Sequence, residues 1–158
     1  MHLDYSQLFC DEVIKSGKSA YLTASGTSMW PAIVSGMKAE IAPLGEELPP
    51  KGTMILVKGC NGLMVHRYWG IRYEKNIPLI ITKGDTNFCF DPSVTRDLVL
   101  GRVVMLLNNK NDARNPNRGF WRLYGRMVCS SEVAARLWAR LCRMVLKAIM
   151  RVEMHRSV

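Results

Sequence analysis

Short hydrophobic segments, separated by Gly, Pro and polar residues, recur along the chain between residues 20 and 107. Their lengths and their alternation of apolar and polar positions are typical of β-strands. Asn61 and Gly62 lie between two of them, which predicts a tight hairpin. The expected strands cover 21–23, 38–43, 54–57, 63–69, 77–82 and 98–107.

Two other segments have the spacing of amphipathic helices. The first covers 3–16 and should end at Gly17. The second should begin after Ser131 and run to about Val152, with basic residues along one side and apolar residues along another. Its basic stripe comprises Arg136, Arg140, Arg143, Lys147 and Arg151, and its apolar face comprises Val133, Leu137, Trp138, Leu141, Val145, Leu146 and Ile149.

These elements predict a mainly β fold, with non-local strand pairing and helices near the two ends. We expect one β domain over residues 1–128, including the helix over 3–16, and a C-terminal basic amphipathic helix within 129–158 that is not an independent domain. The polar segment over 108–117 should form a surface loop. A chain of 158 residues is long enough to bury a core of its own.

The chain has an unusual excess of positive charge. Its formal net charge is +9, and basic residues gather between Arg114 and Arg151, where Glu132 is the sole acidic residue. Such a helix fits an anionic membrane surface or a partner protein, both acting through residues 131–152, or it packs on its own domain with a solvated basic face. Nucleic acid is a weaker candidate, because no recognition motif accompanies the charge.

Cysteine and histidine usage gives no sign of a metal or a cofactor. The five cysteines show no Cys-x-x-Cys spacing, and two of the three histidines lie near the termini. We therefore expect reduced thiols, no metal site and no cofactor. The N-terminus lacks the pattern of a signal peptide, and the uncharged run over 19–37 is rich in Ser, Thr and Gly. These features predict a cytoplasmic protein, with peripheral attachment to the inner face of the membrane left open by the basic helix.

Three side chains in separate segments have the chemistry of an activated serine. Ser28 could act as the nucleophile, His66 as the general base and Asp91 as the group that orients the imidazole. Each residue taken alone has a simpler explanation: Ser28 could cap a turn, His66 could be an ordinary strand residue, and Asp91 could be a turn residue before Pro92. Spacing alone leaves both interpretations open.

The motifs that contain these residues resemble those of the signal peptidase I superfamily, which also contains the self-cleaving repressor proteases. They are Gly-Thr-Ser-Met-Trp-Pro over 26–31, Val-His-Arg over 65–67, and Thr-Lys-Gly-Asp-Thr-Asn over 82–87 followed by Asp91. The resemblance covers about residues 23–104. Most bacterial members use a lysine base, whereas His66 resembles the endoplasmic-reticulum and archaeal branch, which implies a Ser–His–Asp relay.

The resemblance also implies supporting roles within the site. Asp85 matches a Gly-Asp position that holds the last motif in place. Gly26 permits a tight turn, and it stands where bacterial members carry a hydroxyl oxyanion donor, so that Thr27, Ser25 or a backbone amide would have to supply this donor. Met29 and Trp30 are candidates for lining a shallow substrate groove, although both could equally belong to the core.

We expect a serine endopeptidase that cleaves a peptide or precursor protein through an acyl-enzyme. The first alternative is a non-catalytic binding module on the same fold, which docks a partner or a membrane through the basic helix. A self-cleaving transcriptional regulator comes third, because the residues before Ser28 are expected to be too few for a DNA-binding domain and a linker.

Overall fold

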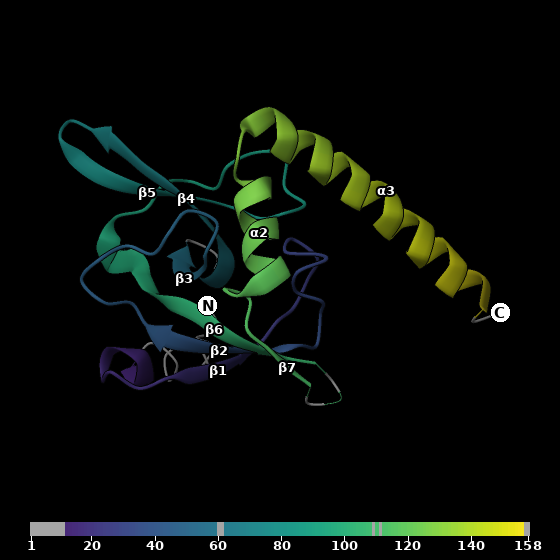
Figure 1. Ribbon diagram of the computed structural model, residues 1–158, viewed down its shortest axis with the longest axis horizontal. Helices are drawn as coiled ribbons and strands as arrows, with labels where there is room; N and C mark the ends of the chain where they lie inside the picture. Colours follow the sequence, from purple (N-terminus) through teal and green to yellow (C-terminus); the bar gives the residue numbers. More distant parts are fainter. Residues whose placement is uncertain (1–11, 60–61, 109, 111, 157–158) are drawn as a thin grey trace.

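The computed structural model describes residues 12–59, 62–108, 110 and 112–156, and its main feature is one antiparallel sheet (Figure 1). Within these residues the sheet contains seven strands, which confirms the expected mainly β fold. The strands are β1 (Ala20–Thr23), β2 (Lys38–Pro43), β3 (Met54–Gly59), β4 (Gly62–Glu74), β5 (Ile77–Lys83), β6 (Val99–Leu107) and β7 (Ala113–Arg114).

The strand order is β1-β2-β6-β3-β4-β5, with β7 pairing to β6. Strand β6 therefore lies between β2 and β3, and it joins the N-terminal and middle parts of the chain into one sheet. The expected hairpin is present as the antiparallel pair β3–β4, whose last pair joins Gly59 to Gly62. Asn61, one of the two predicted turn residues, lies outside the described residues.

The segment over 108–117 is not entirely a loop, contrary to the prediction. Ala113 and Arg114 form β7, which pairs with Leu107 and Leu106 at the end of β6. The same two residues of β6 pair with β2 on their other side, so that this end of β6 lies between two strands. Its polar composition concealed the pairing, because Asn and Asp favour turns and give no alternating pattern.

The N-terminal and C-terminal helices agree with prediction over the part that is described. Residues 12–15 are helical and Gly17 follows with φ of 84°, the left-handed conformation that ends many helices. The rest of the helix predicted over 3–16 lies outside the described residues. At the other end, α3 (Glu132–Arg156) begins where expected and runs slightly beyond the predicted end. A single helical turn, η1 (Arg96–Leu98), precedes β6.

The sequence analysis missed one helix, α2 (Gly119–Val128), which crosses one side of the sheet (Figure 1). Its close approach depends on Gly125, where a Cβ atom would lie 2.7 Å from both the Gly52 carbonyl oxygen and Nη1 of Arg67. Tyr124 and Val128 are buried on the same side and join the main core with Met54 and Leu56. Helix α2 thus covers the middle of the sheet.

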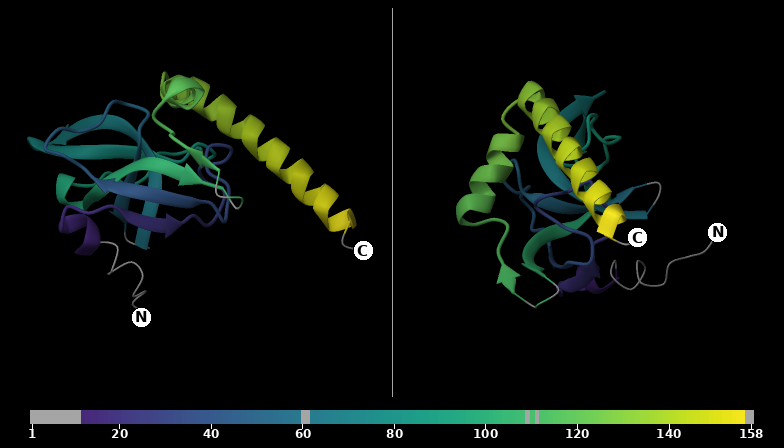
Figure 2. Two further views of the ribbon diagram at one scale, coloured as in Figure 1. Left: turned by 60° about the horizontal axis from the view of Figure 1, so that its bottom comes forward. Right: turned by 90° about the vertical axis from the view of Figure 1, so that its right-hand side faces the viewer.

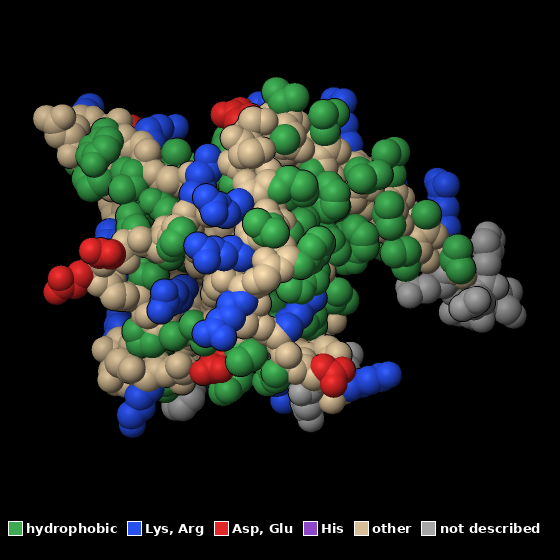
Figure 3. All heavy atoms as spheres, viewed as in Figure 1, with side chains coloured by type: hydrophobic (Ala, Val, Ile, Leu, Met, Phe, Trp, Pro, Cys, Tyr) green, Lys and Arg blue, Asp and Glu red, His purple; other side chains and the backbone are tan. Residues whose placement is uncertain are grey.

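Helix α3 packs on the domain mainly through small residues, together with Trp138 of the predicted apolar face. Ala135, Ala139 and Cys142 are buried, and Trp138 is half-buried. Leu137 and Leu141, by contrast, are 59% and 47% exposed. Figures 1 and 2 show the C-terminal part of α3 extending away from the sheet, and Figure 3 shows hydrophobic side chains along this helix on the viewed face. The division of the chain at residue 128 remains a prediction.

Candidate active site

Ser28 lies in the turn that follows β1, and the loop after β5 holds this turn in place. The Thr86 amide donates a hydrogen bond to the Ser28 carbonyl oxygen over 2.9 Å, and the Thr86 hydroxyl donates one to the Thr27 carbonyl over 3.1 Å. Gly26 adopts a φ of 82°, which favours glycine at this turn. Gly84 allows close contact, because a Cβ atom there would lie 2.8 Å from the Ser28 carbonyl oxygen.

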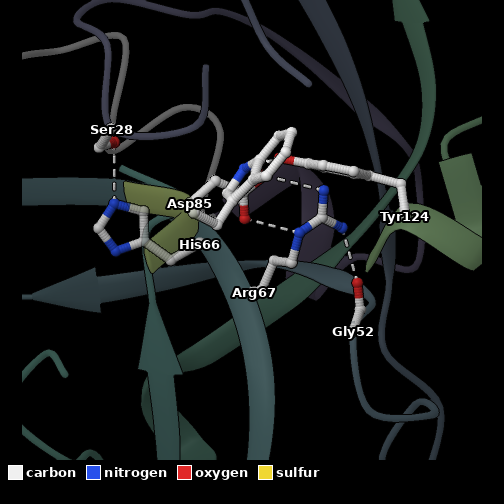
Figure 4. Close-up of polar contacts among 7 residues, drawn as sticks. Ser28, Gly52, His66, Arg67, Asp85 and Tyr124 are labelled. Atoms are coloured by element: carbon white, nitrogen blue, oxygen red, sulfur yellow. Dashed lines mark hydrogen bonds and ion pairs between the residues drawn. The ribbon is translucent and has the colours of Figure 1, made fainter. Parts of the chain in front are cut away.

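His66 comes from the middle of β4, opposite Ile55 of β3, and its imidazole points toward Ser28 (Figure 4). The Nε2 atom lies 3.0 Å from Oγ of Ser28, and Nδ1 lies 2.6 Å from Oδ2 of Asp91. The residue is only 6% exposed, so that packing restricts the ring. The structure therefore brings together the three residues that the sequence analysis named, in the expected order.

Asp91 is fixed by contacts with β5. Its amide donates to the Thr82 carbonyl oxygen over 3.0 Å, and the Thr82 hydroxyl donates to Oδ2 over 2.8 Å. A carboxylate only accepts hydrogen bonds, so that a neutral His66 carries its proton on Nδ1 and presents the lone pair of Nε2 to the serine. Sequence analysis missed Thr82 as a site residue, although it is the first residue of the third motif.

A cavity of about 270 Å³ opens beside Ser28 and His66. Most of its other side chains are apolar, and they come from four strands and the Ser28 turn. Met29 and Gly26 line this cavity, whereas Trp30 and Thr27 do not. Trp30 is half-buried outside it. The larger apolar side chains of the lining are those of Leu22, Met29, Ile33, Leu56, Leu63, Met64 and Val65.

Asp85 belongs to a separate buried cluster rather than to the relay. Its Oδ1 accepts a hydrogen bond from Nε of Arg67 over 2.7 Å, and its Oδ2 accepts bonds from Nη2 of Arg67 and from the Tyr124 hydroxyl. Nη1 of Arg67 donates to the Gly52 carbonyl oxygen over 2.8 Å (Figure 4). The cluster ties β4, the loop after β5 and α2 together.

Burial and charge act in opposite directions on this cluster. Burial lowers the pKa of Arg67, but the adjacent Asp85 carboxylate more than offsets this, so that the net shift is upward. Burial raises the pKa of Tyr124, which remains a neutral donor to Asp85. The Tyr124 hydroxyl in turn accepts a bond from Nε1 of Trp138 over 2.8 Å, which extends the network to α3.

Helix α3 also contacts the loop that holds the serine turn. Nε of Arg143 donates to the Thr86 carbonyl oxygen over 2.9 Å, and its guanidinium lies 4.2 Å from the ring centre of Phe88. Arg143, a member of the predicted basic stripe, is therefore held against this loop. The sequence analysis recognised neither Thr86 nor Arg143 as a residue that supports the site. The two lie 57 residues apart in the chain, and no local pattern predicts a contact over that separation.

Lys83 is buried but does not reach the serine. Its ammonium group lies over the rings of Trp69 and Phe90, at 5.5 and 5.8 Å from the ring centres. Burial lowers the pKa of Lys83. In the described part of the chain no hydrogen bond joins Lys83 to Ser28, whereas His66 makes this contact. Histidine is thus the residue placed to act as the base.

Among the described residues, no cluster of three or more His, Cys, Asp or Glu side chains could hold a metal ion. The described cysteines, Cys89, Cys129 and Cys142, are free thiols, and Cys10 and Cys60 lie outside the described residues. Burial raises the pKa of Cys129 to about 12, so that this thiol stays protonated at neutral pH.

Comparisons with protein family models, with curated proteins and with solved structures gave no match. Within the described residues, no helix combines the length and the hydropathy needed to span a bilayer.

Proposed function

We propose that this protein is a serine endopeptidase of the signal-peptidase-like type, which cleaves a peptide or precursor protein through an acyl-enzyme. The observation that carries the proposal is the continuous line of contacts from Ser28 through His66 to Asp91, with distances of 3.0 and 2.6 Å. Both distances lie within the hydrogen-bonding range required between a nucleophile, its base and the group that orients the base.

In this mechanism His66 takes the proton of Ser28 as Oγ attacks the carbonyl carbon of the scissile peptide bond. Asp91 stabilises the imidazolium that forms, and the Thr82 hydroxyl keeps the carboxylate in line with Nδ1. His66 then gives the proton to the leaving amine, and the acyl-enzyme remains on Ser28. A water molecule deprotonated by the same imidazole hydrolyses the ester and restores the serine.

The negative charge that develops on the carbonyl oxygen needs a hydrogen-bond donor nearby. In the described structure the Ser28 amide has no acceptor within the protein, and its carbonyl is held by Thr86. The Ser28 N–H is therefore our first candidate for the oxyanion site. Thr27, Ser25 and another backbone amide of the same turn remain the candidates for a second donor.

The cavity beside the relay supports a peptide substrate with an apolar side chain next to the scissile bond. Leu22, Ile33 and Leu63 offer no charge for a polar side chain, and Met29 closes one wall. Burying a side chain there would contribute binding energy in proportion to the apolar area removed from water. We infer from this lining that small or medium apolar residues are preferred over charged ones.

A serine-reactive fluorophosphonate, or a peptide aldehyde, tests the proposal directly. The folded wild type should be labelled at Ser28, and Ser28→Ala and His66→Ala should each abolish labelling. Ser35→Ala is the matched control, because Ser35 is exposed and does not line the cavity beside Ser28. It should be labelled like the wild type.

Absence of labelling in correctly folded wild-type protein, with both reagents, would favour the non-catalytic binding module instead. Labelling that persists in Ser28→Ala would place the reactive group elsewhere and reject the assignment of the nucleophile.

A further inference from the structure

The outer faces of α2 and α3 carry an unusual number of exposed hydrophobic side chains. On α2, Phe120 and Leu123 are 70% and 66% exposed. On α3, the side chains of Leu137, Leu141 and Met144 are also exposed. Isolated exposed apolar residues are common, but a contiguous group on one face marks an interaction site.

These side chains form one surface across the two helices, which we call the helical apolar face. It comprises Phe120, Leu123 and Met127 of α2 and Val133, Leu137, Leu141, Met144, Val145, Ile149 and Val152 of α3. A cavity of about 300 Å³ joins the two parts, lined by Met127, Leu137 and Leu141 together with Trp138. Figure 3 shows the hydrophobic side chains as a band that continues from the centre of the view along α3.

Basic side chains border this face where it meets α2. Arg122 and Arg126 follow the polar side of α2 and, with Lys51 and Arg102, line a cavity of about 420 Å³ that contains no acidic residue. No ion pair joins any of these four to another described residue. In Figure 3 a column of Lys and Arg side chains lies beside the apolar band.

A second row of basic residues borders the face along α3. Arg140, Lys147 and Arg151 recur at helical spacing on the side of α3 that adjoins Leu137 and Met144. All three are exposed, and the described structure gives none of them an ion pair. The helical apolar face therefore lies between two rows of unneutralised cations.

We propose that this face binds the surface of an anionic phospholipid membrane, with its apolar side chains among the acyl chains and the two basic rows on the lipid phosphates. An interfacial helix of this type combines an apolar side with flanking Lys and Arg. Charge selects this occupant over the others: a second copy would bring like-charged rows together, and nucleic acid would leave the apolar side chains in water.

The position of the relay makes this surface separate from the candidate catalytic chemistry. None of the side chains in the helical apolar face lines the cavity beside Ser28. Membrane binding is therefore independent of the proposed peptidase activity. The Ser28→Ala variant should bind vesicles as the wild type does, so that the two proposals fail or hold separately.

Sedimentation of the full chain with lipid vesicles tests the proposal. Vesicles of phosphatidylcholine containing about one third phosphatidylglycerol should bind the wild type at least roughly tenfold more tightly than vesicles of phosphatidylcholine alone. Raising the salt concentration should weaken binding, because screening reduces attraction to the charged surface. Equal binding to both vesicles, or no binding to either, would overturn the proposal.

Paired variants locate the contact. Leu137→Glu with Leu141→Glu should weaken binding to the anionic vesicles by about tenfold or more, because two inserted side chains become charged. The matched control is Tyr73→Glu with Ile77→Glu, which adds the same charge to two exposed apolar residues at the end of the β4–β5 hairpin. This control should lose much less.

A second pair of variants tests the basic rows. Arg140→Gln with Lys147→Gln should reduce binding by roughly tenfold. Lys38→Gln with Lys75→Gln removes the same charge from exposed positions, one on β2 and one in the β4–β5 turn, and should have little effect. Equal losses in both pairs would mean that net charge alone governs binding, and would reject the assigned surface.

The other occupants give distinct results. Light scattering without lipid tests for a second copy of the chain. If the wild type is a dimer and Leu137→Glu with Leu141→Glu makes it a monomer, the face binds a second copy and the membrane proposal is rejected. Binding to duplex DNA tests for nucleic acid. If the wild type binds DNA but not vesicles, and this binding is lost in Arg140→Gln with Lys147→Gln but kept in the leucine variants, the surface binds nucleic acid and the membrane proposal is rejected.

Discussion

His66 and Arg67 are neighbours on β4, but their side chains serve two different groups on opposite sides of the strand (Figure 4). Each side chain meets a carboxylate: His66 meets Asp91 over 2.6 Å, and Arg67 meets Asp85 over 2.7 Å. Both pairs are mostly hidden from solvent. On residue types and distances alone, the two pairs look alike.

The two pairs differ in what the remaining nitrogen atoms of each basic side chain contact. Arg67 uses its remaining donor on the Gly52 carbonyl, and Asp85 accepts a further bond from Tyr124, so that the cluster is closed. His66 instead faces a hydroxyl group at the edge of a cavity. A closed network stabilises the fold, whereas an open one can exchange a proton with a substrate. Access to the cavity, and not burial, therefore separates the structural pair from the candidate catalytic pair.

Replacing the orienting carboxylate should give the largest effect. Asp91→Asn should lower the rate of fluorophosphonate labelling at Ser28 by about 10⁴-fold, because an amide that donates to Nδ1 leaves the wrong tautomer facing the serine. Asp97→Asn, on the exposed turn before β6, is the control and should label normally. Normal labelling of Asp91→Asn would remove Asp91 from the relay.

Breaking the buried pair of Arg67 and Asp85 should lower the stability of the fold. Arg67→Met leaves the Asp85 carboxylate buried without its partner, and it should lower the free energy of unfolding by about 3–5 kcal/mol in a urea titration. Arg72→Met on the same strand is the control, since Arg72 and Glu74 form an ion pair with both side chains more than half exposed. It should cost no more than about 1 kcal/mol. Similar small losses in the two variants would contradict the structural role of Arg67.

Lys83 should give the smallest effect. Lys83→Met should retain much of the labelling that His66→Ala abolishes, because the ammonium group contacts Trp69 and Phe90 and makes no hydrogen bond to Ser28 in the described structure. Equal loss of labelling in both variants would make the lysine the base and overturn the present assignment.

The pH dependence of this variant gives a second measurement. Burial lowers the pKa of Lys83 below the ordinary value of 10.5, so that the native state binds fewer protons than the unfolded chain between the two pKa values. This group therefore makes the wild type more stable as the pH rises through that window, and Lys83→Met should lack the contribution.

The sheet could be predicted because its strands carry local signals: apolar runs in β3, alternation in β2, and a turn dipeptide before β4. The relay could be predicted because three motifs hold its residues in a recognisable order. Asp85, which the motif also marks, proved to act through a contact with α2 that no local pattern encodes.

Other features could not be predicted because they depend on contacts between distant segments. Helix α2 contains two glycines in ten residues, which suggests a loop, and Gly125 is explained only by its approach to Gly52 and Arg67. The side of α3 that packs on the domain consists of small residues such as Ala135 and Ala139, while periodicity pointed to the larger ones. Thr86 acquires its role only when β5 places it beside the serine turn.

The adjacency of His66 and Arg67 on β4 has a consequence for how the chain folds. A slip of β4 by one position would place either Arg67 or Val65 where the imidazole faces Ser28. It would correspondingly place Tyr68 or His66 where the guanidinium faces Asp85, so that both sites would lose their partners together. Misaligned intermediates are thereby discouraged at two places by one displacement. Any reactivity at Ser28 should then emerge only in chains whose β4 has found its final alignment, which makes the nucleophile a reporter of completed assembly.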